Sequence, residues 1–449
     1  MKRFVWVALG LAGLAATNAF AWGNHTIPAY RAFEKMPEVA NAAPVPAESL
    51  EAFLKDQEQA IEALLASQDN WGKANLDPYP ALPAALAFKA NPAMTDEARK
   101  LAFFMALRVA PNSKFALYFQ PDPLAAAADT AKLVAFSTVN TLPEQPNSVY
   151  KFAGLKPGEK VAPLSVLASA SDEPDYGLDI NLWSDSPSDW GKVYGFGALP
   201  FGNPSLYYAT QAPFHMGFYH ESSIIYKAAS FIKKTFPQLR THQYSTLAEL
   251  AFRTGHPYWG WRFSGLALHY IQDLTQPYHA SLSPGSSTAK MISINLLAMA
   301  GMGGKKDDMI ILLSNRHLAL EKYQNQTLYR AAVAKEDGIA DKSLRNTSKD
   351  ASYPAWSSLY ARDVVSRESH AYGDQLTKII VDSMPPLYVN DASFDFGPKE
   401  SGIDLKSEVS KIDSAKVATL DNAVAELLGN FGAHSRNLVR GVLAASKTQ

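Results

Sequence analysis

Apolar residues recur at helical spacing along most of the chain. In the segment 46–68 acidic residues and amides lie between the apolar positions, which predicts an amphipathic helix. The same spacing returns over 221–234, 245–253, 257–272, 289–302, 307–334, 357–383 and 414–446. No internal repeat and no long run of strict alternation is present, so no major sheet is expected. The pattern therefore predicts a mainly α fold.

The stretch between residues 70 and 187 departs from this helical pattern. It is richer in proline and glycine, and its runs of alanine and leucine are short. We expect a large N-terminal insertion of mixed short helices and loops at about 45–165. It would lie within a single mainly helical domain that covers residues 22–449.

The segment 289–302 is apolar on nearly every side. It is shorter than the roughly 20 residues that span a bilayer, so a membrane-crossing helix is excluded. Two interpretations remain, a buried core helix and a flap that contacts lipid. Because apolarity all around a helix usually means burial, the core helix is favoured.

The first 21 residues have the three parts of a secretory signal peptide. Two cations, Lys2 and Arg3, precede an apolar run at 4–16, and the segment 19–21 reads Ala-Phe-Ala, a small-x-small cleavage site. We expect cleavage before Trp22 and a secreted or periplasmic protein with no transmembrane segment in its mature chain. An uncleaved anchor is the alternative, but the apolar run is too short to span a bilayer.

Charge and cysteine content narrow the chemistry. The chain has 42 Lys and Arg against 43 Asp and Glu, a formal charge of −1, so no global field attracts nucleic acid and no stable nucleic-acid partner is expected. Cysteine is absent. Disulfides and thiolate zinc sites are therefore excluded, and any metal must be held by His, Asp, Glu or backbone groups.

One predicted helix carries a candidate metal-binding pair. His269 and Asp273 lie four residues apart, so both side chains point from the same helix face and can reach one metal ion. Pro277 is expected to end this helix. His279 would then lie in the turn beyond, where its ring can reach a second ion.

Two further elements offer ligands. His317 and Glu321 repeat the four-residue spacing on another predicted helix and complete a nitrogen and oxygen set with His279. The new N-terminus at Trp22 offers an α-amine with an ordinary pKa near 8, which an adjacent metal holds unprotonated, and His25 follows three residues later. Each pair alone is a weak signal because such pairs also decorate solvated helices.

Together these residues form a specific pattern. It resembles the bacterial zinc-dependent phospholipases C, including the lecithinase toxins, and more distantly the single-strand-specific zinc nucleases of fungi and plants. The resemblance covers residues 22–27 and 165–335, and it implies a helical phospholipase C-like core. The toxins' C-terminal β-sandwich is not expected, because the chain from residue 414 onward reads as helix.

Two ligands of this superfamily fall between the N-terminal histidine and the His269 helix. Asp175 resembles the aspartate of the family's Pro-Asp-Tyr element, with Asp172 as the alternative. His215 resembles the family's next histidine, with His220 as the alternative. Asp175 and His215 are 40 residues apart, a wider spacing than the family usually has.

The resemblance implies three zinc ions per chain. One would be held by His215, His269, Asp175 and Asp273; a second by the Trp22 amine and carbonyl, His25 and a bridging Asp273; the third by His279, His317 and Glu321. Asp175 and Asp273 are the expected catalytic residues. Asp175 would orient or deprotonate the attacking water, and Asp273 would bridge two ions.

The implied activity is that of a secreted phospholipase C acting at a membrane surface. It would cleave the glycerol-side phosphodiester of a phospholipid such as phosphatidylcholine into diacylglycerol and a phosphorylated headgroup. The alternatives are a zinc-dependent single-strand nuclease or 3′-nucleotidase, and a non-catalytic exported protein. Tyr176 would either bind the substrate's cationic headgroup or merely pack beside Asp175. The remaining histidines, 242, 256, 370 and 434, are expected to be structural or exposed, and the aromatic cluster 259–261 to pack in the core.

Overall fold

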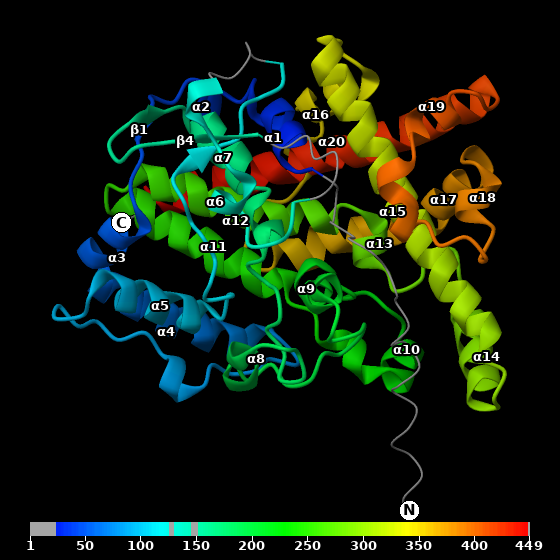
Figure 1. Ribbon diagram of the computed structural model, residues 1–449, viewed down its shortest axis with the longest axis horizontal. Coiled ribbons are helices and arrows are strands. Elements are labelled where there is room, and N and C mark those ends of the chain that lie inside the picture. The colour runs from blue at the N-terminus through cyan, green and yellow to red at the C-terminus, as the bar shows by residue number, and fades with distance from the viewer. Residues whose placement is uncertain (1–23, 125–129, 145–150, 448–449) are drawn as a thin grey trace, which may run out of the picture.

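Helices make up most of the molecule, as the apolar pattern predicts (Figure 1). The computed structural model describes residues 24–124, 130–144 and 151–447, so the expected signal peptide and Trp22 lie outside the described residues. The first ten α-helices are α1 (Thr26–Phe33), α2 (Pro37–Ala40), α3 (Leu50–Asp56), α4 (Glu58–Asn75), α5 (Asp96–Leu107), α6 (Phe136–Val139), α7 (Pro163–Ala170), α8 (Asp189–Val193), α9 (Tyr207–His215) and α10 (Ser223–Ala228).

The second half of the chain holds the two longest described helices, α15 (Gly304–Ala334) and α20 (Ser414–Ala445). Its other α-helices are α11 (Pro237–Arg253), α12 (Pro257–Leu274), α13 (Pro277–Ala280), α14 (Thr288–Met299), α16 (Ile339–Arg345), α17 (Arg367–Ser383), α18 (Pro386–Val389) and α19 (Leu405–Val409). Short helical turns are η2 (Ala84–Leu86), η3 (Thr130–Lys132), η4 (Glu173–Tyr176), η5 (Ser230–Lys233), η6 (Asp350–Ser352), η7 (Ala361–Ser366) and η8 (Gly397–Gly402). The chain from residue 414 onward is helical, as expected.

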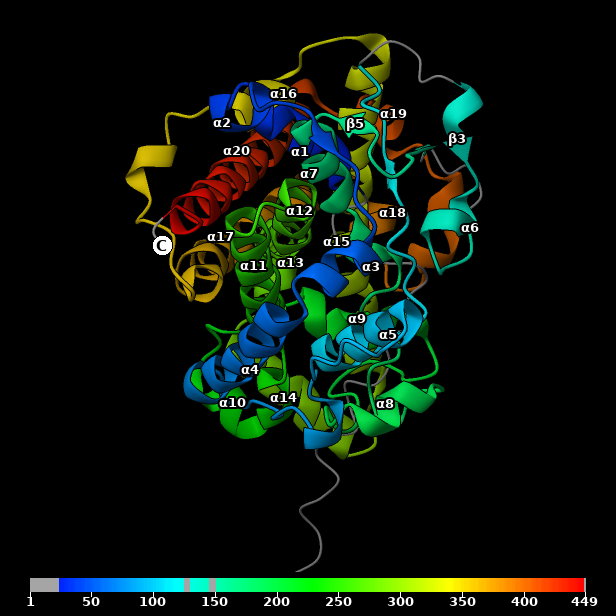
Figure 2. The same cartoon turned by 90° about the vertical axis from the view of Figure 1, so that its left-hand side faces the viewer.

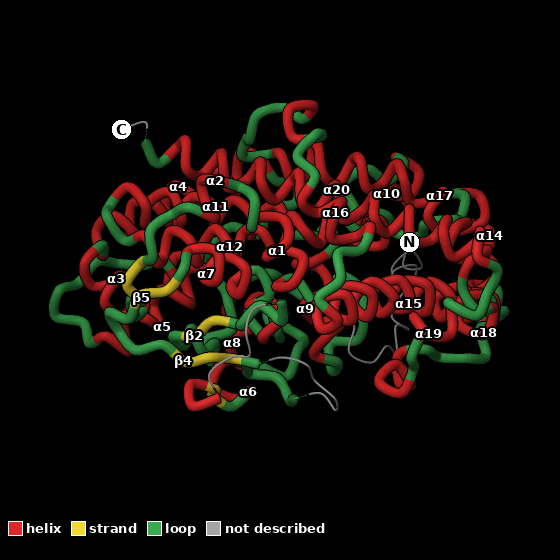
Figure 3. Tube along the Cα trace, turned by 90° about the horizontal axis from the view of Figure 1, so that it is seen from above, coloured by secondary structure: helices red, strands yellow, loops and turns green. Residues whose placement is uncertain are grey.

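The described strands are short and all fall within the expected insertion. β1 (Val45–Pro46) pairs antiparallel with β5 (Lys160–Val161). β4 (Phe152–Gly154) lies between β2 (Tyr118–Phe119) and β3 (Leu133–Val134). Seen from above, they gather on the side of the molecule away from α14 (Figure 3). The insertion therefore consists of short helices, loops and these two small sheets.

Helix α12 is the structural centre. It packs against α11, α7 and α20, and every residue from Tyr258 to Leu274 is buried (Figures 1 and 2). Proline stands at the first position of α11, α12 and α13, where its fixed φ favours a helix start and its missing N–H has no cost. Trp259 and Trp261 pack in the core, as expected. A helix buried on all sides can hold polar side chains away from water.

The insertion shares the core of the rest of the chain. Phe53 on α3 and Phe104 on α5 belong to the same buried cluster as Trp259 and Phe263 on α12. The ring centroids of Phe53 and Phe263 lie 5.8 Å apart. The insertion thus supports α12 from one side.

The expectation of a core helix at 289–302 is wrong. Only Met291 and Ile294 of α14 are buried, whereas Leu296, Met299 and Met302 are 60%, 63% and 56% exposed. The helix pairs mainly with α15 and stands at the lower right edge of Figure 1. All-round apolarity therefore does not reflect burial here, because only one face of α14 is covered.

Other element boundaries also differ from the sequence expectations. The helix expected at 46–68 divides at Gln57 into α3 and α4, and the one at 221–234 divides at Ala229, where the backbone leaves the helical region. His279 lies in the short helix α13 instead of a turn. None of the described helices combines the length and apolarity needed to cross a membrane.

Candidate metal centre

Eight of the nine expected metal ligands are described, and the fold gathers them in three buried groups. They are His25 with Asp175 and His269; His215 with His269 and Asp273; and His279 with His317 and Glu321. Within each group the ligand atoms lie within 4.8 Å of one another. Each group can therefore hold a metal ion, and the chain has the donors for three.

These ligands come from elements far apart in the sequence. His25 immediately precedes α1, Asp175 lies in η4, and His215 ends α9. The central helix α12 presents His269 and Asp273 one turn apart on the same face. The third group joins His279 on α13 with the pair on α15.

Asp273 is the hub of the first two groups. Its Oδ2 lies 3.0 Å from His215 Nδ1 and 3.3 Å from His269 Nε2, while its Oδ1 lies 3.4 Å from His25 Nε2. Asp175 Oδ1 is 3.7 Å from His215 Nδ1, and Asp175 Oδ2 is 4.0 Å from His25 Nε2. The two oxygens of Asp273 thus face different imidazoles, an arrangement suited to bridging two ions.

The third group is more compact. His317 Nε2 lies 2.6 Å from Glu321 Oε1, and His279 Nε2 lies 3.0 Å from His317 Nε2 and 3.3 Å from the same carboxylate oxygen. The ring of Tyr278 stacks on that of His317 at a centroid distance of 5.6 Å. Two nitrogens and one oxygen therefore converge on one point.

The ring nitrogens that face away from the groups form hydrogen bonds, and these bonds orient the lone pairs of the other ring nitrogens toward the group. His269 Nδ1 lies 2.8 Å from the Ser171 carbonyl oxygen, and His279 Nδ1 lies 3.0 Å from the His215 carbonyl oxygen. Because a carbonyl oxygen only accepts, Nδ1 must donate, and Nε2 of each neutral ring presents its lone pair to the group. Lone pairs 2.9–3.0 Å apart repel unless a cation or a proton lies between them.

Two buried carboxylate oxygens also require a cation or a proton nearby. Asp175 Oδ1 and Asp273 Oδ1 are fully buried and have no hydrogen-bond partner among the described residues. Leaving a buried acceptor unsatisfied is costly, so such atoms in a native fold call for an unseen partner. Both face the imidazoles described above, and a bound cation fits that position.

Protons fulfil this role when no ion is bound. Burial lowers the pKa of His25, but Asp273 and Asp175 outweigh it and raise that pKa to about 9. Burial also lowers the pKa of His215, while Asp179 and Asp273 raise it to about 10. Both rings are therefore protonated on both nitrogens and positively charged at neutral pH when no metal is bound, and metal binding would release the second proton.

The acidic ligands have opposite pKa shifts. Burial raises the pKa of Asp175 to about 8. Burial also acts to raise the pKa of Asp273, but the surrounding imidazoles, His269 first, hold it well below its usual range. In the third group, His317 outweighs burial and lowers the pKa of Glu321 to about 2. The carboxyl groups of Asp175 and Asp273, which lie in one site, therefore differ in protonation, and such a difference is typical of functional sites.

Residues behind the ligands fix their orientation, and the sequence did not identify them. Asp179 Oδ2 accepts a 2.7 Å hydrogen bond from Tyr270 and lies 3.5 Å from His215 Nε2, while Asp179 Oδ1 lies 2.7 Å from an Arg240 guanidinium nitrogen. Despite burial, Arg240 lowers the pKa of Asp179. The carboxylate therefore holds the His215 ring with Nδ1 facing the ligands.

Two glutamines complete this supporting layer. Gln272 on α12 accepts a 2.9 Å hydrogen bond at its Oε1 from His25 Nδ1, and Gln276, which caps the start of α13, donates from its Nε2 to Glu321 Oε1 at 3.2 Å. Gln272 follows His269 by three residues on the same helix. That helical spacing is a sequence signal that could have identified Gln272.

The structure brings Asp175 and His215 into the groups and leaves out their alternatives. Asp172 Oδ1 instead accepts the backbone N–H of His25, and its Oδ2 accepts the hydroxyl of Tyr176. His220 Nε2 contacts the Arg362 carbonyl oxygen at 2.7 Å. Asp172 therefore positions the backbone of a ligand, and His220 ties a loop to η7.

Tyr176 lies beside the site but faces away from it. Its side chain is buried in a cluster with Tyr118 and Phe152, and its hydroxyl donates to Asp172 Oδ2 at 2.7 Å. The Phe152 ring meets it edge-on at a centroid distance of 5.7 Å. This placement favours the packing interpretation over contact with a headgroup.

The four remaining histidines have contacts of a structural kind. His242 stacks on Trp71, and burial lowers its pKa to about 4. His256 pairs with Glu48 and Asp56 near the surface, and His370 contacts Ser281. His434 is buried between Tyr360 and Glu368. None of them belongs to the three groups.

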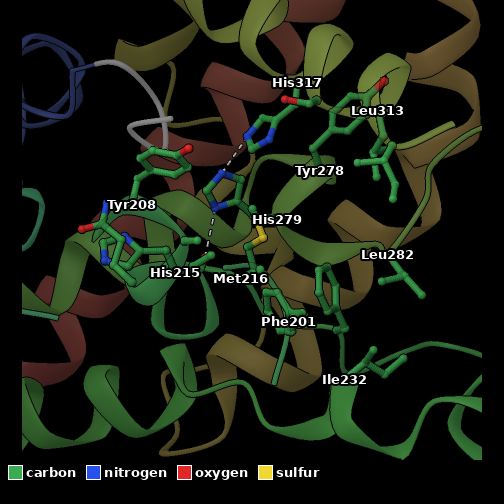
Figure 4. Close-up of a pocket in the computed structure, with 17 residues that line it drawn as sticks. Phe201, Tyr208, His215, Met216, Ile232, Tyr278, His279, Leu282, Leu313 and His317 are labelled. Carbon is green, nitrogen blue, oxygen red and sulfur yellow. Dashed lines mark hydrogen bonds between the residues drawn. The ribbon is translucent and has the colours of Figure 1, made fainter. Parts of the chain in front are cut away.

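An apolar pocket opens beside the ligands (Figure 4). Its cavity has a volume of about 130 Å³, and His215, His279 and His317 form one wall. The rest of the lining is mainly aliphatic and aromatic, with Phe201, Tyr208, Met216, Phe218, Ile232, Tyr278, Leu282, Ile310 and Leu313, and it includes the polar Gln211 and Ser314. A bound molecule can therefore place a polar group at the metal ligands and an apolar part in the pocket.

The chain was compared with models of protein families, with curated proteins and with solved structures, and none of them matches. The resemblance to the zinc phospholipases C therefore rests on the ligand residues that carry it.

Proposed function

We propose that the protein is an exported zinc-dependent phosphodiester hydrolase of the phospholipase C type. It would cleave the bond between phosphorus and the glycerol oxygen of a phospholipid, adding water to give diacylglycerol and a phosphorylated headgroup. The observation that carries this proposal is the meeting of three metal-binding groups with an apolar pocket. Phosphate binds at the first feature and lipid at the second.

The donor atoms suit zinc. Imidazole nitrogen and carboxylate oxygen are common zinc ligands, and each group offers at least one of each kind. Zinc ions held there would lower the pKa of water toward neutrality and neutralise phosphoryl oxygens as charge develops. The protein's near-zero net charge makes such a local field necessary for binding an anionic phosphate.

The protein's own residues then have separate roles. Asp273 would hold two ions, because its two oxygens face different histidines. Asp175, whose Oδ1 has no hydrogen-bond partner among the described residues, orients the attacking water and accepts its proton. His279, His317 and Glu321 would hold a third ion, and two of them, His279 and His317, also line the pocket, so this group is placed to bind the substrate phosphate.

The second expected ligand set also includes Trp22, which lies outside the described residues. Two residues, Gly23 and Asn24, lie between it and the buried ligand His25 in the sequence. We propose that cleavage before Trp22 exposes an amine that joins His25 and Asp273 as a metal ligand. The closeness of the expected cleavage point to His25 in the sequence supports this role.

The pocket favours lipid over a nucleic-acid substrate. A nuclease pocket stacks the base on aromatic side chains and reads its polar edge. Here the lining includes Met216, Ile232, Leu282, Ile310 and Leu313 besides four aromatic residues, Phe201, Tyr208, Phe218 and Tyr278. The aliphatic side chains support an acyl or glycerol portion as the bound group.

Substrate assays test the proposal. The zinc-reconstituted protein is incubated with short-chain phosphatidylcholine and, separately, with single-stranded DNA, and released phosphocholine and cleaved DNA are measured. We expect phosphocholine and diacylglycerol in equal amounts, and a loss of at least about a thousandfold in Asp273→Asn. The exposed Asp189 supplies the control, since Asp189→Asn should retain full activity. DNA cleavage without phosphocholine release would replace the proposal with the nuclease alternative.

A further inference from the structure

Exposed apolar side chains gather at one end of the molecule. On α14 and the turn after it, Leu296, Met299 and Met302 are more than half exposed, and Ile224 on α10 is 55% exposed. We call these four residues the apolar ridge. Most large apolar side chains of the described chain are buried, so a ridge of this kind marks a contact surface.

The two helices of the apolar ridge rest on one buried cluster. Met291 of α14 packs in the same cluster as Ile225 of α10, Ile232 of η5 and Phe218. Figures 1 and 2 both show α10 and α14 next to each other at the same end of the molecule. The ridge is therefore one surface held by a common base.

Lysines flank the apolar ridge in the sequence. The segments 222–234 and 281–305 together contain five lysines that are not buried, Lys227, Lys233, Lys234, Lys290 and Lys305, and no acidic residue. Lys306 is buried, and the first acids after the ridge are Asp307 and Asp308 in the first turns of α15. In a chain with a formal charge of −1, this is a local excess of positive charge. Apolar side chains flanked by lysines are complementary to a bilayer surface that contains anionic lipid.

The base of the ridge also forms the wall of the pocket. Phe201, Phe218 and Ile232 belong both to the buried cluster and to the pocket lining. The pocket's other wall carries His215 and His279 of the metal-binding groups (Figure 4). An apolar path therefore runs from the ridge to the ligands.

From these contacts we infer that the α10 and α14 ridge docks the protein on an anionic lipid bilayer. The side chains of Leu296, Met299 and Met302 enter the interface, and the lysines pair with lipid phosphates. The inference rests on the proposed function in one respect: the lipid drawn into the pocket is then the substrate of the metal centre. Docking on the bilayer requires only the apolar ridge and the lysines beside it, and not an active metal centre.

Vesicle binding tests the inference directly. The exported protein is purified, its N-terminus is determined by mass because an uncleaved apolar run would itself bind lipid, and it is sedimented with vesicles. The vesicles contain phosphatidylcholine alone or with one-third phosphatidylglycerol. We expect tighter binding to the anionic vesicles, weakened at least about tenfold in Leu296→Ser/Met299→Ser and in Lys227→Glu/Lys290→Glu.

A matched control distinguishes docking through the apolar ridge from non-specific hydrophobic binding. Leu101 on α5 and Val333 near the end of α15 are 49% and 58% exposed, similar to the ridge residues, but lie on other elements. Leu101→Ser/Val333→Ser should bind vesicles as the parent protein does. Equal losses in the control and the ridge variants would overturn the inference, as would vesicle binding that none of these changes affects.

Monomeric short-chain phosphatidylcholine distinguishes failure of docking from failure of the proposed function. The ridge variants should hydrolyse this dissolved substrate with unchanged kcat/KM and lose activity only on vesicles. Activity on the dissolved substrate without any vesicle binding would overturn docking and leave the proposed function standing. Vesicle binding through the ridge without hydrolysis of either substrate would do the reverse. Self-association that the ridge variants abolish, without vesicle binding, would assign the surface to a second copy of the chain.

Discussion

At the residue scale, the metal centre is a set of acceptors held against one another in a buried space. His215 Nδ1 and His269 Nε2 lie 2.9 Å apart, and a carboxylate oxygen of Asp273 lies 3.0 Å from the first. Backbone carbonyls and Asp179 prevent the rings from turning away. This arrangement is stable only with positive charge at its centre, from protons or from metal ions.

The choice between His215 and His220 is testable by metal content. His215→Gln should lower the bound zinc from three ions per chain to two, because it removes one nitrogen from a shared ligand set. His220→Gln is the matched control and should retain three, since its ring contacts only a carbonyl of Arg362 among the described hydrogen bonds. Elemental analysis after gel filtration measures both. Loss of zinc in the control alone would reverse the assignment.

Asp179 is a positioning residue, and its removal should affect both stability and metal affinity. Asp179→Asn leaves the Arg240 guanidinium buried without its anion, which should lower the free energy of unfolding by about 3 kcal/mol. It also frees the His215 ring, which should weaken zinc binding about 10- to 100-fold. Denaturant titration and competition with a zinc chelator measure the two effects.

The control for Asp179 is Asp189→Asn, which alters an exposed carboxylate. Asp189 pairs only with Lys192 one helical turn away and should change neither quantity measurably. A purely structural role for Asp179 would lower stability and leave zinc affinity intact. That result would contradict the positioning role.

At the element scale, helix spacing predicted the ligand pairs that share a helix, whereas Asp175 and His215, which lie on other elements, were expected only from the resemblance. The four-residue spacings of His269 with Asp273 and of His317 with Glu321 follow from helix geometry, and both pairs lie where expected. The supporting Asp179 could not be predicted in this way, because its partner Arg240 is 61 residues away and meets it only in the folded chain.

Helix α14 was expected in the core for a related reason, because local sequence does not reveal contacts with distant segments. Periodicity describes a helix and its faces, but burial depends on how many neighbours cover those faces. Helix α12 is covered on all sides and α14 mainly by α15, although both sequences are strongly apolar. Tertiary packing, and not local pattern, decides between these cases. The helical class of the fold needed only the local pattern and was predicted correctly.

Helix α12 is also tightly fixed against α7. A Cβ at Gly265 would lie 2.5 Å from the Ala170 side chain and 2.6 Å from the Leu167 carbonyl oxygen. Gly265→Ala should therefore push the helices apart and lower the free energy of unfolding by about 2 kcal/mol. The shift also moves Ser171 away from His269, so zinc affinity should fall. Denaturant titration measures the stability.

A helix glycine in open surroundings provides the comparison. The nearest atom to a Cβ at Gly429 on α20 would be 3.8 Å away, which is an ordinary contact. Gly429→Ala should be neutral or raise stability by about 0.5–1 kcal/mol, because alanine favours helix. If both substitutions stabilised the protein alike, the close packing of α12 on α7 would be refuted.

At the scale of the whole molecule, the ligands join segments from residue 25 to residue 321. The loop before α1 and helices α9, α12, α13 and α15 all contribute to the three groups. Ions that bind only when these segments are assembled stabilise the folded state by mass action. Metal ions bound there would therefore link segments from both halves of the chain.

Removal of metal should therefore destabilise the entire fold. At a free zinc concentration a thousandfold above Kd, each site contributes about 4 kcal/mol. Adding a strong chelator should lower Tm by at least about 5 °C, and restoring zinc should recover it. Calorimetry with and without chelator measures the change. A Tm that chelation leaves unaltered would mean that the three groups do not bind metal in the folded protein.

The proposed chemistry requires three zinc ions in these three groups. Anomalous diffraction from a crystal of the zinc-reconstituted protein, recorded on both sides of the zinc absorption edge, would locate them. We predict three anomalous peaks, one within the ligand set of His215, His269 and Asp273, one beside His25, and one among His279, His317 and Glu321. Density without anomalous peaks at these positions, or peaks confined to surface residues, would contradict the account.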